Sequence, residues 1–128
     1  HLMVEEFGLV SIREARVAYE TTDLRSKLGR HHADVDSAFR GWNDIWLSPD
    51  FLSWSIESLL PDVHCPVLAI QGVDDQYGTM EHIDGIARVL PATRLLKLDA
   101  CGHSPHRDQP EQVIDATVEF LRGLRRAG

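Results

Sequence analysis

Apolar residues recur at a helical period through the first half of the chain. Between Val35 and Trp46 they stand three and four positions apart, which predicts one amphipathic helix ended by the Ser-Pro pair that follows. An earlier helix is expected to begin at Ser11, because Ser11 and Glu14 have the spacing of a capping box. Thr22 is a plausible N-cap for a further helix. This half holds all three tryptophans and predicts a small helical layer.

The second half changes to short apolar runs that alternate with amphipathic helices. Residues 66–72 form an apolar run bounded by Pro and Gly, which predicts a buried strand, and residues 94–98 predict a second. Thr79 is expected to cap a helix that Pro91 ends, and Pro110 opens a final helix. The residues expected to face inward on that final helix are Val113, Ile114, Thr117, Phe120 and Leu121. Strand, helix, strand, helix is the alternation of a parallel sheet, so the fold class is α/β.

These patterns divide the chain into a helical region, residues 1–61, and an α/β region, residues 62–128. Two parallel strands cannot hide both faces and both edges of a sheet, so the sheet is expected to be incomplete. A missing N-terminal segment, another chain, or self-association along an exposed strand edge should complete it. The abrupt start at His1 likewise suggests that the sequence begins inside a longer one.

Composition narrows the class of partner. The chain has 128 residues, of which 43% are apolar and 26% charged, as in an ordinary globular domain. A net charge of −7 without a dense Lys/Arg block disfavours nucleic acid and anionic membranes and favours a small neutral or apolar ligand. No apolar run approaches the ~20 residues of a membrane helix, and no signal pattern opens the chain. Cys65 and Cys101 are too few for a disulfide scaffold. We therefore expect free thiols and a cytoplasmic protein.

Each predicted strand ends in a loop that carries a group able to do chemistry. Asp74 and Asp75 follow the first strand, and His103 follows the second, directly after Gly102. Because the carboxyl ends of parallel strands meet at one edge of a sheet, a carboxylate and the imidazole are expected to lie together. A carboxylate in that position fixes the tautomer of an imidazole and stabilises the imidazolium.

The order Gly72-x-x-Asp75, then Gly102-His103, then Asp108-x-Pro110-Glu111 at the start of the last helix, resembles the α/β-hydrolase family. The resemblance extends from Pro66 to about Leu124, and the helical part before it corresponds by position to the family's lid. It implies the C-terminal fragment of an α/β-hydrolase, with a helical lid followed by the last two strands and helices of the core.

The resemblance also implies roles for individual residues. Asp75, rather than Asp74, is the acid of a catalytic triad, and His103 is the general base. Neither a cofactor nor a metal is implied. Many relatives have a β-branched residue and Pro after the acid, whereas this chain has Gln76-Tyr77-Gly78, so the local turn is expected to differ.

The nucleophile of such a triad is absent from these residues. No two of the nine glycines stand four positions apart, so no serine lies in the G-x-S-x-G elbow of the family. The oxyanion-hole loop, which belongs to the N-terminal half in this family, is also absent. The resemblance therefore implies part of a serine-type hydrolase acting on a carboxylic ester or on a C–C bond beside a carbonyl. It should be inactive without the half that carries serine.

Aromatic side chains suggest the nature of the substrate. Phe39, Trp42 and Trp46 form one stripe, which fits either the core of the helical region or the wall of a pocket. Together with Tyr77, beside the predicted acid, they are the candidate substrate-binding residues. They imply a small-molecule substrate with an apolar acyl part.

Several rival interpretations remain open. A metal cluster is disfavoured because it lacks a third strong ligand at fixed spacing; its members would be His31, His32, Asp34 and Asp36. Cys101 shares a loop with His103, which is poor geometry for a thiol nucleophile. Ser104 and His106 are interpreted as loop residues. At the level of function, the alternatives are a non-catalytic binding module that retains the hydrolase fold and an independent small α/β domain.

Overall fold

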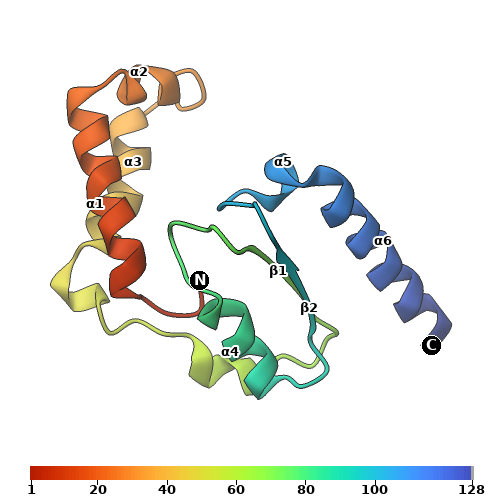
Figure 1. The fold of residues 1–128 in the computed structure, drawn as a ribbon. Helices are drawn as coiled ribbons and strands as arrows, with labels where there is room; N and C mark the ends of the chain where they lie inside the picture. The colour runs from red at the N-terminus through yellow and green to blue at the C-terminus, as the bar shows by residue number, and fades with distance from the viewer. Residues whose placement is uncertain (128) are drawn as a thin grey trace. The chain divides into compact units, whose positions relative to one another are not determined.

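The computed structural model describes residues 1–127. They form two compact units, one of Met3–Ser55 and one of His1–Leu2 together with the chain from Ile56 onward. Each unit is described by itself (Figure 1). The assignment of residues 1–61 as a lid and 62–128 as part of a catalytic core stays a prediction.

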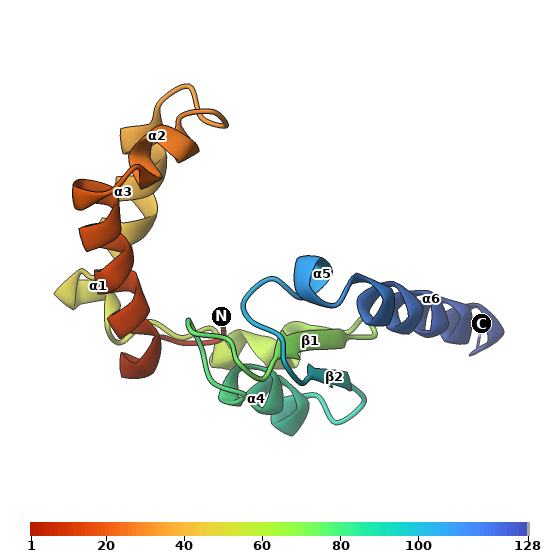
Figure 2. The same cartoon turned by 45° about the horizontal axis from the view of Figure 1, so that its top comes forward.

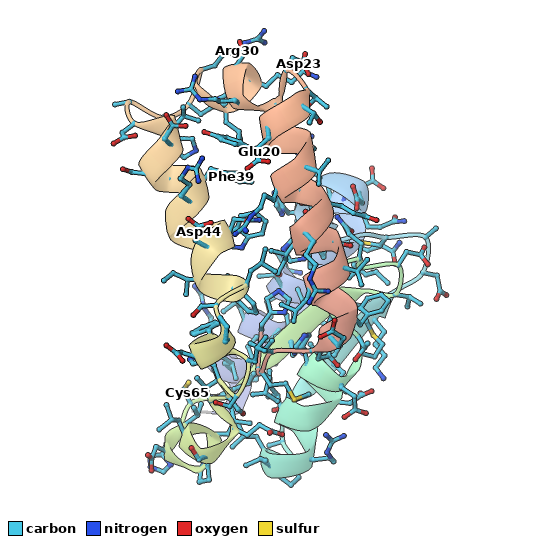
Figure 3. All side chains as sticks on the ribbon, turned by 90° about the vertical axis from the view of Figure 1, so that its left-hand side faces the viewer. Glu20, Asp23, Arg30, Phe39, Asp44 and Cys65 are labelled. Atoms are coloured by element: carbon cyan, nitrogen blue, oxygen red, sulfur yellow. The ribbon has the colours of Figure 1, made fainter. Side chains whose placement is uncertain are left out.

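The Met3–Ser55 unit is helical. It contains α1 (Glu6–Thr21), α2 (Leu24–Leu28), α3 (Val35–Trp46) and the short 3₁₀ helix η1 (Pro49–Phe51). Helices α1 and α3 run side by side in opposite directions, joined through α2 (Figure 1). The ring of Phe39 stacks on Tyr19 between them, with ring centroids 3.8 Å apart (Figure 3). Buried aromatic rings from both helices thus form the centre of this unit.

The prediction for α3 is confirmed, whereas the predicted start of α1 is wrong. Helix α1 begins at Glu6, and Ser11 lies within it instead of at its N-cap. The reason is packing: Leu9 and Ile12 are both 2% exposed on one helix face, so the buried stripe starts before the apparent capping box. At the start of α3, the Asp34 side chain accepts a hydrogen bond from the Ser37 backbone N–H.

The second unit contains a two-stranded parallel sheet between helices. Strand β1 (Leu68–Gly72) pairs with β2 (Arg94–Leu98), with Leu68 opposite Arg94 and Gly72 opposite Leu98. Helix α4 (Glu81–Val89) connects the strands and covers one face, and α5 (Pro105–Asp108) and α6 (Pro110–Ala127) lie on the other (Figure 2). The 3₁₀ helix η2 (Glu57–Asp62) packs on α4. The predicted α/β class is confirmed.

Helix α6 buries less of its apolar face than its sequence predicts. Val113, Thr117 and Phe120 are half-buried, but Ile114 and Leu121 are 59% and 53% exposed. The expectation that these two residues face inward is therefore wrong for the described structure. A sheet of two strands is narrower than the apolar stripe of an amphipathic helix, so part of the stripe has nothing to cover.

The remaining helix ends follow local chemistry. The Thr79 hydroxyl accepts a hydrogen bond from the Glu81 backbone N–H, so this threonine satisfies a donor at the start of α4. Helix α6 is 18 residues long and ends with Arg125 and Arg126 in its last turn. Within residues 1–127, no helix combines the length and the apolar character needed to cross a membrane.

Candidate active site

The ends of β1 and β2 bring Asp75 and His103 together. The Nδ1 atom of His103 lies 3.0 Å from each carboxylate oxygen of Asp75. Asp75 is only 8% exposed, whereas the His103 side chain is 47% exposed. The carboxylate is therefore buried behind the imidazole, and the imidazole opens outward.

This contact determines which nitrogen of His103 carries a proton. A carboxylate only accepts hydrogen bonds, so Nδ1–H is the donor to Asp75. In the neutral ring, Nε2 then has a free lone pair, which is the form required of a general base. The pair can take a proton at Nε2 and stabilise the resulting imidazolium.

Two hydrogen-bond donors near the end of β1 hold the acid loop. The Tyr77 backbone N–H donates to Asp75 Oδ1 at 2.9 Å, closing an Asx-type turn. Gln71 is buried in β1, and its Nε2 donates to the carbonyls of Gly78 at 2.9 Å and Thr79 at 3.1 Å. The same nitrogen lies 3.5 Å from Asp75 Oδ2. The sequence analysis missed Gln71, although a single polar residue inside an apolar run was the available signal.

The histidine loop lies against the acid loop through backbone contacts. The Val73 N–H donates to Leu98 O at 2.8 Å, and the Asp74 N–H donates to Cys101 O at 2.9 Å. At Gly72 a Cβ atom would overlap the carbonyl oxygens of Cys101 and the residue after it, so only glycine fits there. This close approach explains why glycine must end β1.

Helix α5 and its C-cap residue hold the other side of the histidine loop. The Gly102 N–H donates to Asp108 Oδ2 at 2.9 Å. The side-chain amide of Gln109 lies 3.4 Å from the carbonyl oxygens of Asp99 and Ala100. Ala100 has a positive φ of 49°, a left-handed turn that redirects the chain after β2. Helix α5 was not predicted from the sequence.

A cavity of about 220 Å³ opens beside the acid and the imidazole. Its apolar wall consists of Leu2, Ile70, Ile83, Ile86 and Pro105, and its polar wall consists of His1, Gln71, Asp75, His82 and His103. All of these residues belong to the unit that contains the sheet. The cavity therefore combines an apolar wall with a polar one that includes the acid–imidazole pair, as in many small-molecule sites.

His82 is a buried histidine in this wall that the sequence analysis missed. It is 5% exposed, and its Nδ1 accepts the Leu2 backbone N–H at 3.2 Å. Its Nε2 therefore carries the proton and lies 2.9 Å from His1 Nδ1. The rings of His1 and His103 stack with centroids 5.9 Å apart, so an imidazole flanks the candidate base.

The four aromatic candidates fall in different units. Tyr77 packs its ring edgewise against His103, with centroids 4.9 Å apart. Phe39, Trp42 and Trp46 belong to the Met3–Ser55 unit, in which Phe39 is 8% exposed. Trp42 and Trp46 are half-buried, and both make edge contacts with neighbouring rings of that unit.

The cysteines lie in contrasting environments. Both are free; Cys65 is exposed in the loop before β1 (Figure 3), and Cys101 is buried. Burial raises the pKa of the Cys101 thiol, and the neighbouring carboxylates of Asp108 and Asp74 raise it further. Cys101 therefore stays protonated at neutral pH and does not serve as a thiolate nucleophile.

The two aspartates of the suspected metal cluster have other roles. Asp34 caps α3, and Asp36 accepts hydrogen bonds from Arg25 and Tyr19. His32 precedes α3, so it does not share a helix face with Asp36. Among the residues that the structure describes, no group of three His, Cys, Asp or Glu side chains could hold a metal ion.

Comparison with known proteins finds similarity to hydrolases. No family model matches the chain. A curated relative, the pimeloyl-[acyl-carrier protein] methyl ester esterase of Aromatoleum aromaticum, is 34% identical over 64 residues. That match covers 50% of this chain and 26% of the relative. The chain thus spans about a quarter of the length of the relative that it matches.

Solved structures resemble the chain over most of its length. A carboxylesterase structure from Nitrososphaera gargenis aligns with a TM-score of 0.70 and 17% identity, covering 98% of this chain and 54% of that one. An esterase of Thermogutta terrifontis gives a TM-score of 0.54 and 20% identity, with coverages of 96% and 53%. A bacterial membrane phospholipase A gives a TM-score of 0.58 and 26% identity, with coverages of 70% and 28%. In each case the chain matches only part of the other protein.

Proposed function

Because the chain belongs to the α/β-hydrolase fold family, we propose that it supplies the acid and the base of a serine-type ester hydrolase. The observation that carries the proposal is the pair of 3.0 Å contacts between His103 Nδ1 and the Asp75 carboxylate. These residues follow neighbouring parallel strands, in the order acid then histidine that the family uses.

The proposed reaction starts at His103 Nε2. This nitrogen takes the proton of a serine hydroxyl as the oxygen attacks the ester carbonyl, and Asp75 stabilises the imidazolium that forms. The protonated ring then returns the proton to the departing alcohol, which leaves an acyl-enzyme. Water, deprotonated by the same nitrogen, attacks the acyl-enzyme, and the ring then returns that proton to the serine oxygen as the acid leaves. These steps need only side chains, so we propose no metal or cofactor.

The nucleophile and the oxyanion hole must come from residues outside this sequence. None of its serines lies in a glycine elbow. Each missing oxyanion donor is worth about 10²–10³ in rate. We therefore propose that the chain is inactive by itself, and that its partner is a segment that carries the elbow and completes the sheet.

The proposed substrate is a carboxylic ester with an apolar acyl part. Apolar side chains form half of the wall of the cavity beside His103, and Tyr77 packs on that imidazole. An ester is favoured over a C–C bond beside a carbonyl because the curated relative is named an ester hydrolase.

A chimera tests this proposal. Residues 62–128 replace the corresponding C-terminal segment of the Aromatoleum esterase, and hydrolysis of p-nitrophenyl butyrate is measured. The chimera should hydrolyse the ester, and His103→Gln or Asp75→Asn should each lower kcat by about 10³–10⁴-fold. His106→Gln is the matched control, since His106 is an exposed histidine of the same region and should leave kcat within about twofold.

The outcomes separate catalysis from binding. A folded chimera that keeps its activity with His103→Gln would show that this histidine is not the base, and the binding-module interpretation would replace ours. The 128-residue chain alone should show no hydrolysis above the buffer rate. Turnover by the chain alone would contradict the proposed dependence on an outside serine.

A further inference from the structure

We propose that Asp108 is a positioning residue of the candidate site, which holds His103 in its productive orientation by accepting the Gly102 N–H. The inference rests on the proposed role of His103 as the base. The carboxylate belongs to α5 and accepts its hydrogen bond from the backbone of Gly102, not from the His103 ring. It acts through the backbone that precedes the histidine, at a distance of 2.9 Å between Oδ2 and the Gly102 nitrogen.

The hydrogen bonds of Asp108 hold the residues on both sides of His103. Its own backbone N–H donates to Ser104 O at 3.0 Å, while its side chain accepts from Gly102. One residue therefore ties both neighbours of His103 in the chain. The short helix α5 makes this possible because its single turn brings residue 108 back to the segment 102–104.

The loop needs this hydrogen bond because its contacts with the acid loop and with the Gln109 side chain end before the histidine. On the β1 side, backbone bonds reach Leu98 and Cys101. Gln109 contacts the carbonyls of Asp99 and Ala100, also upstream. On the N-terminal side of His103, the Gly102 N–H is the nearest anchored group, and Asp108 accepts its hydrogen bond.

The orientation of His103 also depends on this hydrogen bond because neighbouring rings, those of His1 and Tyr77, cover its imidazole only in part. The side chain is 47% exposed, so packing alone leaves room for other rotamers. Misplacing a reacting group by about 1 Å can cost a factor of about 10² in rate. A backbone anchor one residue away is thus a direct way to keep Nδ1 aimed at Asp75.

Nitrogen-15 NMR of the full 128-residue chain tests the inference without requiring catalysis. In Asp108→Ala, exchange of the Gly102 amide proton should accelerate by about tenfold, the equivalent of one ordinary hydrogen bond. The His103 ring nitrogens should move away from the Nδ1–H tautomer toward a mixture of tautomers. Asp108→Asn retains an oxygen acceptor and should restore both signals toward those of the wild type.

Matched variants distinguish positioning from charge and from stability. Asp99→Asn removes an exposed carboxylate from the same loop and should leave the His103 tautomer unchanged. The inference is wrong if Asp108→Ala keeps the Nδ1–H tautomer while folded, or if Asp108→Asn loses it as fully as Asp108→Ala. Absence of the Nδ1–H tautomer in the wild-type chain would instead contradict the proposed Asp75–His103 pair itself.

Discussion

At the scale of single residues, the site combines a buried acid with an open base. Asp75 can be buried because its oxygens accept hydrogen bonds from His103 and the Tyr77 backbone. A buried carboxylate without such partners would be strongly disfavoured. Gln71 stabilises the acid loop, because its amide donates hydrogen bonds to the carbonyls of Gly78 and Thr79, which lie just after that loop.

Gln71→Leu tests how much this buried amide contributes. Leucine is similar in size but leaves the Gly78 and Thr79 carbonyls without this donor, so the free energy of unfolding should fall by about 1–3 kcal/mol. Urea unfolding followed by far-UV circular dichroism measures the change. Gln112→Leu, at an exposed position of α6, should change stability by no more than about 0.5 kcal/mol. Equal losses in both variants would contradict a special role for Gln71.

The residues of the site differ in how well the sequence predicts them. Asp75 and His103 follow strands whose apolar runs are evident, and the carboxyl ends of parallel strands meet by topology. Gln71 and His82 gain their roles from tertiary contacts with Thr79 and Leu2, which no local pattern contains. Asp108 was recognised only as part of a motif, because its bond to Gly102 depends on the unpredicted turn of α5.

At the scale of elements, one cluster of polar side chains links the three α-helices of the Met3–Ser55 unit. Arg25 from α2 donates two hydrogen bonds to the Asp36 carboxylate of α3, at 2.9 and 2.6 Å. Tyr19 of α1 donates to the same carboxylate at 2.7 Å. The hydrogen bonds from Arg25 and Tyr19 lower the pKa of Asp36. Burial, followed by the neighbouring Asp36, raises the pKa of Tyr19.

This cluster predicts how the helical unit responds to acid. Because the pKa of Asp36 is lower in the folded state than the ~3.9 of an unfolded aspartate, the ionised form stabilises the fold above that pH. The contribution is lost as the pH falls below about 4 toward the folded-state pKa. The Asp36→Asn variant should therefore be less stable than the wild type at pH 7, and it should lose less stability than the wild type between pH 5 and pH 2.

Tryptophan fluorescence measures this effect selectively, because all three tryptophans lie in the Met3–Ser55 unit. Thermal unfolding is followed from pH 7 to pH 2 for both proteins. The Arg25 and Asp36 side chains are 56% and 49% exposed, so water screens the pair and the difference should shrink in high salt. Asp50→Asn, at an exposed carboxylate of η1, is the control and should track the wild type.

The elements themselves were largely predictable, and their boundaries were not. Helix α3 and strand β2 match their expected ranges, because a full apolar period or a compact apolar run marks each of them. Helix α1 starts at Glu6 rather than Ser11, since the burial of Leu9 outweighs a local capping signal. Single-residue caps contribute about 1 kcal/mol, comparable to burying one side chain, so packing readily shifts a helix start.

At the scale of the whole molecule, the described sheet has only two strands. Both outer edges of the β1–β2 pair lack a neighbouring strand in the part of the chain that the structure describes. On α6, four apolar residues share one stripe and are 38–59% exposed: Ile114, Val118, Leu121 and Leu124. Open strand edges and contiguous apolar surface both favour association. The solved esterase structures continue well beyond the region that this chain matches.

Without the proposed partner segment, two copies of the chain should therefore associate through their open strand edges and the apolar stripes of α6. Sedimentation velocity should show an average mass that rises with protein concentration. The double variant Ile114→Glu and Leu121→Glu should reduce that rise. Its far-UV circular dichroism spectrum should keep the helical signal of the wild type. Glu119→Gln, on the same helix, is a control that leaves the apolar stripe intact. A wild-type chain that stays monomeric at every concentration, with amides of both outer strand edges protected from exchange, would contradict this expectation. That outcome would favour an independent small α/β domain, because a closed, self-sufficient sheet has no need of further strands.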